Sequence, residues 1–306
     1  MPDKPFFTYV ALGSVHVPHT PANEYSDGTL LKGQYQTGHM DVLNEMDKVV
    51  GSLVDHLKSQ GVLNNTIIVF ASDNGGLGGD ISSEEYGHVS NGPLRGYKGM
   101  IYEGGHTIPM IFRWDNGLVP KEEKRSRLVG LSDLFATLTD MVGIQKPGSQ
   151  AIDSISFANY LFDETNQYGL REHFGIWRAY SHIQQFSALR KGSMKLVYNH
   201  ESRMSELYDL SKDQSEQTDI SAQNEVLVNE MKQILRQIGP CVDRKGRFKV
   251  NVRWNPNFTT SCAWFARERS RCRWSPDAKF NCGKTCASSS NACLSLVDLG
   301  NKVIVV

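Results

Sequence analysis

The sequence predicts an α/β fold: a partial doubly wound, mostly parallel sheet with flanking helices, followed by a small C-terminal antiparallel sheet with one helix. Two apolar runs, residues 4–13 and 67–71, are rich in β-branched and aromatic residues without helical spacing, which is typical of buried strands. Between them, residues 34–60 repeat apolar side chains at the spacing of an amphipathic helix. A strand, a helix and a strand in this order predict a parallel βαβ unit with a right-handed crossover.

The helix predicted at residues 34–60 has one apolar face, and we expect its acidic and basic residues to lie mostly in solvent. Gly61 follows it directly and is expected to cap its C-terminus. The apolar face consists of Tyr35, Met40, Leu43, Met46, Val50, Leu53, Val54 and Leu57.

Later segments complete the predicted fold. Residues 108–112 form another apolar run, 131–142 have helical spacing with Ser132 as the expected cap, and 152–162 predict a shorter helical piece. Short strand candidates and a closing amphipathic helix then predict the antiparallel sheet. The strand candidates are residues 172–176, 186–190, 194–198 and 207–210, and the helix is residues 225–238.

Composition excludes several classes of protein. The chain has 306 residues and a formal net charge of zero, with 40% hydrophobic and 22% charged residues, as in ordinary globular proteins. Without a basic excess there is no argument for a nucleic-acid partner. No apolar run is long enough to span a membrane, and the first residues do not form the apolar stretch of a signal peptide.

The first candidate site residues are Asp73 and Asn74, which follow the strand at 67–71 and precede two glycines. Ligands of open α/β sheets bind beyond the carboxyl ends of strands. A carboxylate beside an amide carbonyl offers hard oxygens suited to Ca²⁺ or, less favourably, Mg²⁺. The simpler interpretation is an Asp-Asn-Gly turn, which needs no ligand.

Two further segments carry candidate residues. Arg95 and Lys98 lie in a glycine-rich stretch, residues 92–105, and supply positive charge for an oxyanion. His16 and His19 lie in a loop after the first strand, where imidazoles can act as acids or hydrogen-bond donors. Two exposed histidines in a proline-rich loop are the alternative.

The motifs SDNGG, PLRGYKG, YEGG and IPMIF occur in this order and together resemble the sulfatase family of the alkaline-phosphatase-like superfamily, specifically its arylsulfatase B-like branch. The resemblance implies that Asp73 and Asn74 bind calcium and that Lys98 contacts the sulfate group. It also implies that His16 contacts the sulfate ester and protonates the leaving oxygen, with Arg95 as a nearby supporting charge. His19 has no equally clear match in that branch.

The resemblance covers about residues 4–238, and it divides the chain into three parts. Residues 1–165 correspond to the second half of the catalytic domain, 166–239 to the small C-terminal subdomain, and 240–306 to a cysteine-rich tail without a match. Sulfatases of this type make a formylglycine nucleophile in the pattern C/S-x-P/A-x-R, and no cysteine or serine of this sequence satisfies it. We therefore expect an N-terminally truncated sulfatase that does not hydrolyse sulfate esters as written.

All six cysteines lie between Cys241 and Cys293, a pattern that favours disulfides and an oxidising compartment. A zinc site is the alternative, although only one pair has suitable spacing, Cys282 and Cys286. Asn64 and Asn257 begin N-glycosylation tripeptides. These features predict a lysosomal or secreted glycoprotein.

Three functions remain open at this level. The first is a sulfuric ester hydrolase acting on a glycosaminoglycan-type sugar sulfate or an aryl sulfate. The second is a non-catalytic sulfatase-like protein that binds an anion or a carbohydrate. The third is a phosphatase on the same fold, which should show a Thr or Ser nucleophile beside the ligands of two metals, and that pattern is not visible.

Overall fold

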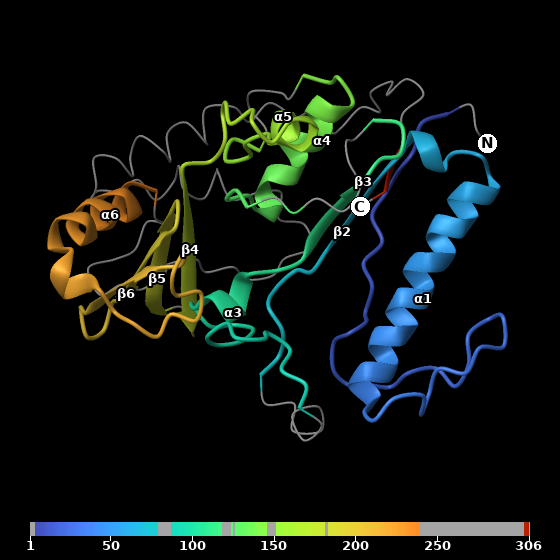
Figure 1. Ribbon diagram of the computed structural model, residues 1–306, viewed down its shortest axis with the longest axis horizontal. Coiled ribbons are helices and arrows are strands. Elements are labelled where there is room, and N and C mark those ends of the chain that lie inside the picture. Colours follow the sequence, from blue (N-terminus) through green and yellow to red (C-terminus); the bar gives the residue numbers. More distant parts are fainter. Residues whose placement is uncertain are drawn as a thin grey trace, which may run out of the picture.

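The computed structural model describes residues 4–78, 87–117, 124, 126–145, 151–180, 183–238 and 303–305; for 177–180, 183–185 and 303–305 it describes the backbone alone. These residues form two four-stranded sheets with helices against them (Figure 1). The mixed architecture confirms the predicted fold class. The cysteines and Asn257 lie outside the described residues, so their predicted roles stay predictions.

The first sheet has the strand order β1 (Phe7–Thr8), β8 (Val303–Val305), β2 (Thr66–Ala71) and β3 (Met110–Arg113). β8 runs parallel to both of its neighbours, whereas β3 is antiparallel to β2. The predicted strand at 4–13 is therefore shorter than expected. β8 has only three residues, and only two of them pair with β1.

Helix α1 (Gly38–Ser59) confirms the predicted long helix. It begins at Thr37, whose hydroxyl accepts a hydrogen bond from the Met40 amide at 3.2 Å, and Gly61 follows its end with a φ of +70°. The predicted apolar face is only partly covered, since Leu43 and Leu53 remain 42% and 38% exposed.

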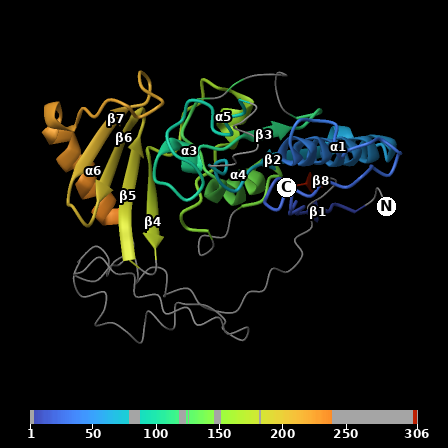
Figure 2. The ribbon, with the colours of Figure 1, turned by 90° about the horizontal axis from the view of Figure 1, so that it is seen from below.

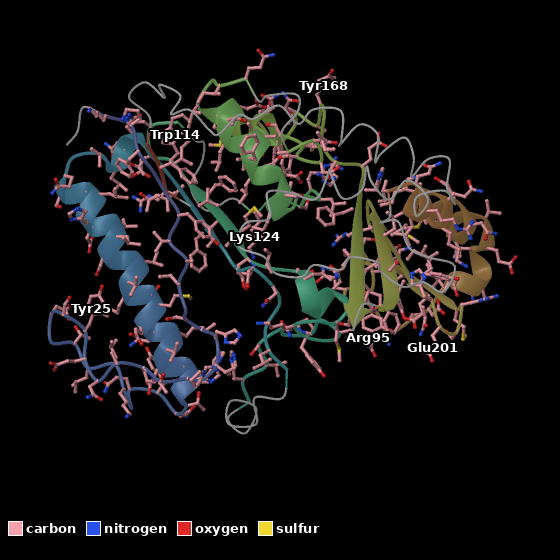
Figure 3. All side chains as sticks on the ribbon, turned by 180° about the vertical axis from the view of Figure 1, so that it is seen from behind. Tyr25, Arg95, Trp114, Lys124, Tyr168 and Glu201 are labelled. Atoms are coloured by element: carbon pink, nitrogen blue, oxygen red, sulfur yellow. The ribbon has the colours of Figure 1, made fainter. Side chains whose placement is uncertain are left out.

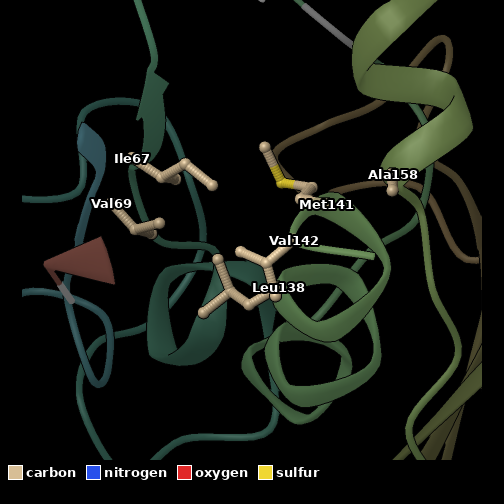
Figure 4. Packing of buried hydrophobic residues seen from close by; sticks show 6 residues of the cluster. All are labelled: Ile67, Val69, Leu138, Met141, Val142 and Ala158. Atoms are coloured by element: carbon tan, nitrogen blue, oxygen red, sulfur yellow. The ribbon is translucent and has the colours of Figure 1, made fainter. Parts of the chain in front are cut away.

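The core of the first part lies between β2 and two helices, α4 (Leu134–Met141) and α5 (Ala158–Phe162). In Figure 1 the sheet lies between α1 and the pair α4 and α5. The buried side chains alternate along β2 and recur at helical spacing along α4, as Figure 4 shows. They are Ile67, Val69, Leu138, Met141, Val142 and Ala158.

A 3₁₀ turn, η2 (Leu131–Asp133), precedes α4. The prediction that Ser132 caps this helix is wrong. The side chain of Asp133, not of Ser132, accepts the Gly130 amide at 3.0 Å and the Ile155 amide at 3.0 Å. Asp133 is buried and also pairs with Arg171. A carboxylate can accept all of these hydrogen bonds, which a serine hydroxyl cannot.

The second sheet is an antiparallel meander, β4 (His173–Tyr180), β5 (Ile183–Lys191), β6 (Met194–Asn199) and β7 (Ser205–Asp209). Helix α6 (Glu225–Ile238) packs on one face of it (Figure 2). The shared core consists of Leu189, Leu196, Leu207, Val228, Met231 and Leu235. This arrangement confirms the small sheet with one helix that the sequence predicts.

The short helix α3 (Glu103–His106) lies between the two sheets and contacts the loop after β2 and strand β6 of the second sheet (Figure 1). Two further 3₁₀ turns, η1 (Leu63–Asn65) and η3 (Ser221–Gln223), precede β2 and α6. Among the described helices, none combines the length and the hydropathy that crossing a membrane requires.

Candidate functional site

Asp73 and Asn74 lie in the loop that leaves the carboxyl end of β2, as the sequence predicts. Asp73 is exposed, and no described residue donates a hydrogen bond to its carboxylate. The side-chain amide of Asn74 donates from Nδ2 to the Gly75 carbonyl at 3.0 Å, which leaves Oδ1 as an acceptor. The loop is held by Ser72, whose hydroxyl donates to the Asn74 carbonyl at 2.8 Å. Two side chains therefore present oxygens with unused acceptor capacity.

The glycines after this pair permit a very close approach between two segments. The Gly75 amide donates to the Gly105 carbonyl at 3.0 Å. A Cβ on Gly75 would lie 1.9 Å from the Gly104 carbonyl oxygen, so no larger residue fits without moving the backbone. The glycine-rich loop and α3 are thus packed directly against the chain that carries Asp73 and Asn74.

Asn91 and Lys98 fasten the other side of the same loop. The Asn91 side chain accepts the Gly76 amide at 2.7 Å and donates to the Gly76 and Gly96 carbonyls at 3.1 and 3.2 Å. The Lys98 amide donates to the Gly76 carbonyl at 2.9 Å. These bonds bring the half-buried Lys98 into the loop cluster beside Asp73 and Asn74.

The histidines of the first loop take different positions. His16 is exposed, and its Nδ1 contacts the Val17 carbonyl at 2.7 Å. In the described contacts it bonds within its own loop, so its approach to Lys98 stays a prediction. His19 instead contacts His39 at the start of α1, with Nε2 and Nδ1 3.3 Å apart.

Arg95 is engaged with the second sheet (Figure 3). Its Nη1 donates to the Tyr208 hydroxyl at 2.9 Å and to the Glu216 carbonyl at 3.1 Å. Its guanidinium also lies 3.6 Å from the centroid of the Tyr102 ring. These contacts join the glycine-rich loop to the C-terminal sheet. Direct contact of Arg95 with a sulfate oxygen stays a prediction.

A buried ion network reinforces the same junction. Lys195 on β6 is completely buried, and its Nζ lies 2.9 Å from Glu103 Oε1 and 2.8 Å from Glu216 Oε1. Glu103 also pairs with Arg190 at 3.0 Å, and the Glu103 amide donates to Glu216 Oε2 at 2.7 Å. Because Glu103 begins α3, the network fixes the helix against which Gly75 packs.

The network shifts the protonation of its members in opposite directions. Burial, together with the charge of Lys195, lowers the pKa of His106 to about 4, so this imidazole is neutral at pH 7. Burial raises the pKa of the Glu216 carboxyl. Burial also acts to raise the pKa of Glu103, but the Lys195 ammonium outweighs it and holds that pKa below its usual value. The buried lysine therefore keeps the Glu103 carboxylate ionised.

Comparisons with known proteins agree with this arrangement. The family model Sulfatase matches residues 1–144, and the model described as N-sulphoglucosamine sulphohydrolase, C-terminal, matches residues 96–239. Together they span the second sheet, the first sheet apart from β8, and the junction between the sheets. The chain belongs to the sulfatase family.

Two relatives within the sulfatase family show what share of a sulfatase's length this chain matches. A sulfatase of Formosa agariphila is 29% identical over 72% of this chain and 43% of the relative. The N-acetylgalactosamine-6-O-sulfatase of Bacteroides thetaiotaomicron is 28% identical over 77% of this chain and 47% of the relative. The chain thus spans about half the length of the curated relatives it matches. The arylsulfatase B-like branch stays a prediction.

A solved structure supports the same fold. A sulfatase from a glycosaminoglycan-metabolism locus of Bacteroides thetaiotaomicron superposes with a TM-score of 0.60 at 28% identity. The match covers 74% of this chain and 48% of that one. The two sheets of this chain are therefore parts of the sulfatase fold.

Sequence reasoning missed the residues that hold the site together in this sulfatase chain. Glu103 was noted only as part of the YEGG motif, and Asn91 and Lys195 were not singled out. An asparagine before Gly-Pro is a local signal for a loop-fixing side chain. Lys195 has no such signal, because a lysine in the alternating sequence of β6 is typical of a strand with one polar face.

The candidate metal ligands fit a calcium ion in part. Asp73 and Asn74 supply two hard oxygens, whereas Ca²⁺ takes six to eight oxygen ligands. Across the residues with described side chains, no group of three His, Cys, Asp or Glu residues is placed to hold a metal ion. The described part of the chain thus offers one side of such a site.

Proposed function

We propose that this chain forms the C-terminal part of the active site of a sulfuric ester hydrolase that acts on sulfated sugars. The observation that carries the proposal is the loop after β2, where Asp73 and Asn74 present unused oxygen acceptors beside the loop of Lys98. The name of the Bacteroides thetaiotaomicron relative, an N-acetylgalactosamine-6-O-sulfatase, supports a sugar sulfate over an aryl sulfate.

Asp73 and Asn74 are proposed to bind Ca²⁺, with Mg²⁺ as the less suitable ion. When bound, the ion supplies positive charge next to the sulfate oxygens. Asp73 contributes a full negative charge and Asn74 a neutral carbonyl oxygen. The hydrogen bond from the Gly75 amide fixes the loop that carries Asp73 and Asn74 before an ion binds. This lowers the entropic cost of ordering the loop on binding.

Lys98 is proposed to hold the sulfate group through its ammonium, and His16 to contact the ester and donate a proton to the leaving oxygen. An imidazole can both donate and accept protons near neutral pH, which suits that task. Arg95 is proposed to support this charge indirectly, because its contacts with Tyr208 and Glu216 fix the loop that carries Lys98. The covalent nucleophile of the family has no acceptor motif in this sequence.

Calcium titration of the full chain tests the assignment. We expect Asp73→Ala to weaken Ca²⁺ binding by about tenfold or more, since it removes a charge and a ligand together. Asp55→Ala on the exposed side of α1 is the matched control and should bind calcium like the parent. Equal affinities of the two variants would show that Asp73 is only a turn residue.

A non-catalytic sulfatase-like protein that binds an anion or a carbohydrate is the second candidate function. The absent nucleophile pattern favours it for the sequence as written. An assay with an aryl sulfate and a sugar 6-sulfate, in the presence of Ca²⁺, separates the two. We expect no turnover from these residues alone. Turnover that disappears in Asp73→Ala would show a nucleophile that the family pattern does not reveal.

The compartment is proposed to be lysosomal or extracellular. Support comes from the six clustered cysteines and from Asn64, which begins a glycosylation tripeptide and is exposed in η1. We expect the cysteines of residues 240–306 to form disulfides in protein from the secretory pathway. A count of free thiols under denaturing conditions tests this, and six free thiols would contradict it.

A further inference from the structure

The Asn91 side chain joins the loop after β2 directly to the loop of Lys98. Its Oδ1 accepts the Gly76 amide at 2.7 Å, and its Nδ2 donates to the Gly76 and Gly96 carbonyls at 3.1 and 3.2 Å. Gly76 lies two positions after Asn74, and Gly96 lies two positions before Lys98. These three hydrogen bonds are named here the Asn91 clasp. One side chain thus connects the segments that carry the proposed calcium and sulfate ligands.

The Asn91 clasp restrains a residue that would otherwise be the most flexible point of its loop. Asn91 is bonded to the peptide groups on both sides of the Gly76 Cα, so it restricts both backbone dihedral angles there. Glycine has more conformational freedom than any other residue. No stiffer residue fits, because a Cβ on Gly76 would lie 2.6 Å from the Ser90 Cβ and 2.9 Å from Asn91 Oδ1. The Asn91 side chain therefore supplies the rigidity that a glycine lacks.

The same contacts determine where the backbone of Lys98 lies. The Gly76 carbonyl that accepts from Asn91 also accepts the Lys98 amide at 2.9 Å. The Gly96 carbonyl packs closely on α3, where a Cβ on Gly104 would lie 2.2 Å from its oxygen. The direction of the Gly76 carbonyl thus depends on Asn91, and the position of the Lys98 backbone depends on that carbonyl.

A turn holds Asn91 itself in place. The Asn91 carbonyl accepts the Leu94 amide at 3.1 Å, and the Gly92 amide donates to the Val89 carbonyl at 2.9 Å. Gly92 has a φ of +55°, which favours glycine, and the ring of Pro93 fixes its own φ. Because the backbone around Asn91 is already restricted, holding its side chain in the clasp costs less conformational entropy.

We infer that Asn91 is a positioning residue that couples the binding of Ca²⁺ in the loop after β2 to the binding of sulfate at Lys98. The inference rests on the proposed function for the identity of both ions. With the Asn91 clasp intact, the two loops keep one spacing, at which a single sulfate group meets the calcium ion and the ammonium together. Asn91 needs no contact with either ion, since its hydrogen bonds go to backbone groups. Coupling between two sites is reciprocal, so each ion strengthens the binding of the other.

Calorimetry on the full chain, with Ca²⁺ and inorganic sulfate as the probes, tests the coupling. In the parent chain we expect saturating Ca²⁺ to tighten sulfate binding by about tenfold, which is within the usual range for coupled sites. In Asn91→Ala this advantage should fall below about twofold. Ca²⁺ alone should still bind to Asn91→Ala, because its ligands remain. Coupling of the parental size in Asn91→Ala, or independent binding of the two ions by the parent chain, would overturn the inference.

Asn224→Ala is the matched control, because it also removes a half-buried side-chain donor but lies just before α6, outside both loops. Asn224 donates from Nδ2 to the Ile220 carbonyl at 2.8 Å. We expect this variant to have a lower melting temperature than the parent and the full coupling between Ca²⁺ and sulfate. Loss of the coupling in Asn224→Ala as well would show a general effect of destabilisation and would overturn the inference.

Two more variants separate the Asn91 clasp from the sulfate position. Asn91→Asp retains an acceptor for the Gly76 amide but cannot donate to the two carbonyls at neutral pH, so it opens part of the clasp even if Asn91→Ala does not fold. Its coupling should also be smaller than that of the parent, and parental coupling would overturn the inference. Lys98→Met should weaken sulfate binding with and without Ca²⁺, and an unchanged affinity would overturn the proposed function.

Amide hydrogen exchange in the ion-free chain applies even if neither ion binds. We expect the Gly76 and Lys98 amides to exchange about tenfold faster in Asn91→Ala and at the parental rate in Asn224→Ala. Exchange that is unchanged in Asn91→Ala would overturn the inference. Faster exchange in a chain that binds neither ion would uphold the positioning role of Asn91 and reject the proposed function.

Discussion

The junction between the two sheets and the loop after β2 both contain charged groups, but these groups differ in burial and in pairing. At the junction, Lys195 is completely buried and lies within 3 Å of two carboxylates, those of Glu103 and Glu216. In the loop after β2, Asp73 is exposed and accepts no hydrogen bond from the described residues. The first region pairs its charges internally, whereas Asp73 in the second accepts no hydrogen bond from the described residues.

The difference follows from the cost of removing charge from water. A buried charge without a partner is strongly destabilising, so Lys195 and its carboxylates must be paired for the junction to fold. An exposed carboxylate keeps its hydration and can remain open until a ligand arrives. Paired buried charge therefore indicates a structural role, and open charge held on a fixed loop indicates a binding role.

Breaking the junction should have the largest effect on stability. Lys195→Met leaves two carboxylates close together without their shared cation, and we expect a loss of about 3–5 kcal/mol in the free energy of unfolding. Lys212→Met is the matched control, because Lys212 is exposed and its pair with Asp209 spans 3.4 Å. That change should cost less than about 1 kcal/mol in urea denaturation. Similar costs for the two variants would remove the contrast between the regions.

Acid should destabilise the junction through His106. Its pKa is about 4 in the folded protein against an ordinary 6.5, so the unfolded chain binds the proton first. Stability from this group is complete above pH 6.5 and is lost as the pH falls toward 4, by up to about 3 kcal/mol. The raised pKa of Glu216 acts in the opposite direction. His106→Asn should flatten the pH dependence of thermal unfolding between pH 6.5 and 4, and an unchanged slope would contradict the assignment.

Filling the close approach at Gly75 should have an intermediate effect. Gly75→Ala pushes a methyl group into the Gly104 carbonyl, and we expect a loss of about 1–3 kcal/mol together with weaker calcium binding. Gly51→Ala is the control, since Gly51 lies within α1 and a Cβ there meets nothing within 4 Å. That substitution should stabilise the chain by about 0.5–1 kcal/mol. A tolerated Gly75→Ala would show that the loop is not held by this packing.

The smallest effect on stability is expected at the candidate site itself. Asp73→Ala removes an exposed side chain without described partners, so the free energy of unfolding should change by less than about 0.5 kcal/mol in the absence of calcium. Added Ca²⁺ should raise the melting temperature of the parent and not of the variant. A strong destabilisation without calcium would place Asp73 among the structural charges instead.

The predicted elements agree with the structure where the signal is local. The period of residues 34–60, the apolar strand at 67–71 and the neighbouring strands at 186–190 and 194–198 all depend on neighbours within a few positions. Predictions that depended on distant partners were less accurate. The length of the strand predicted at 4–13 was overestimated, because it depends on pairing with β8 at the other end of the chain.

For the candidate site, the sequence by itself determined the motifs: Asp73 and Asn74 after a strand, and Lys98 among glycines. These residues are neighbours of a strand end or a turn, and such features are written in short segments. Only the tertiary structure decided that Arg95 turns toward Tyr208 and that His39 meets His19. It also paired Lys195 with Glu103, which lie 92 positions apart. A buried lysine and an exposed one look alike in sequence, because burial depends on packing between segments and not on the residues next to it.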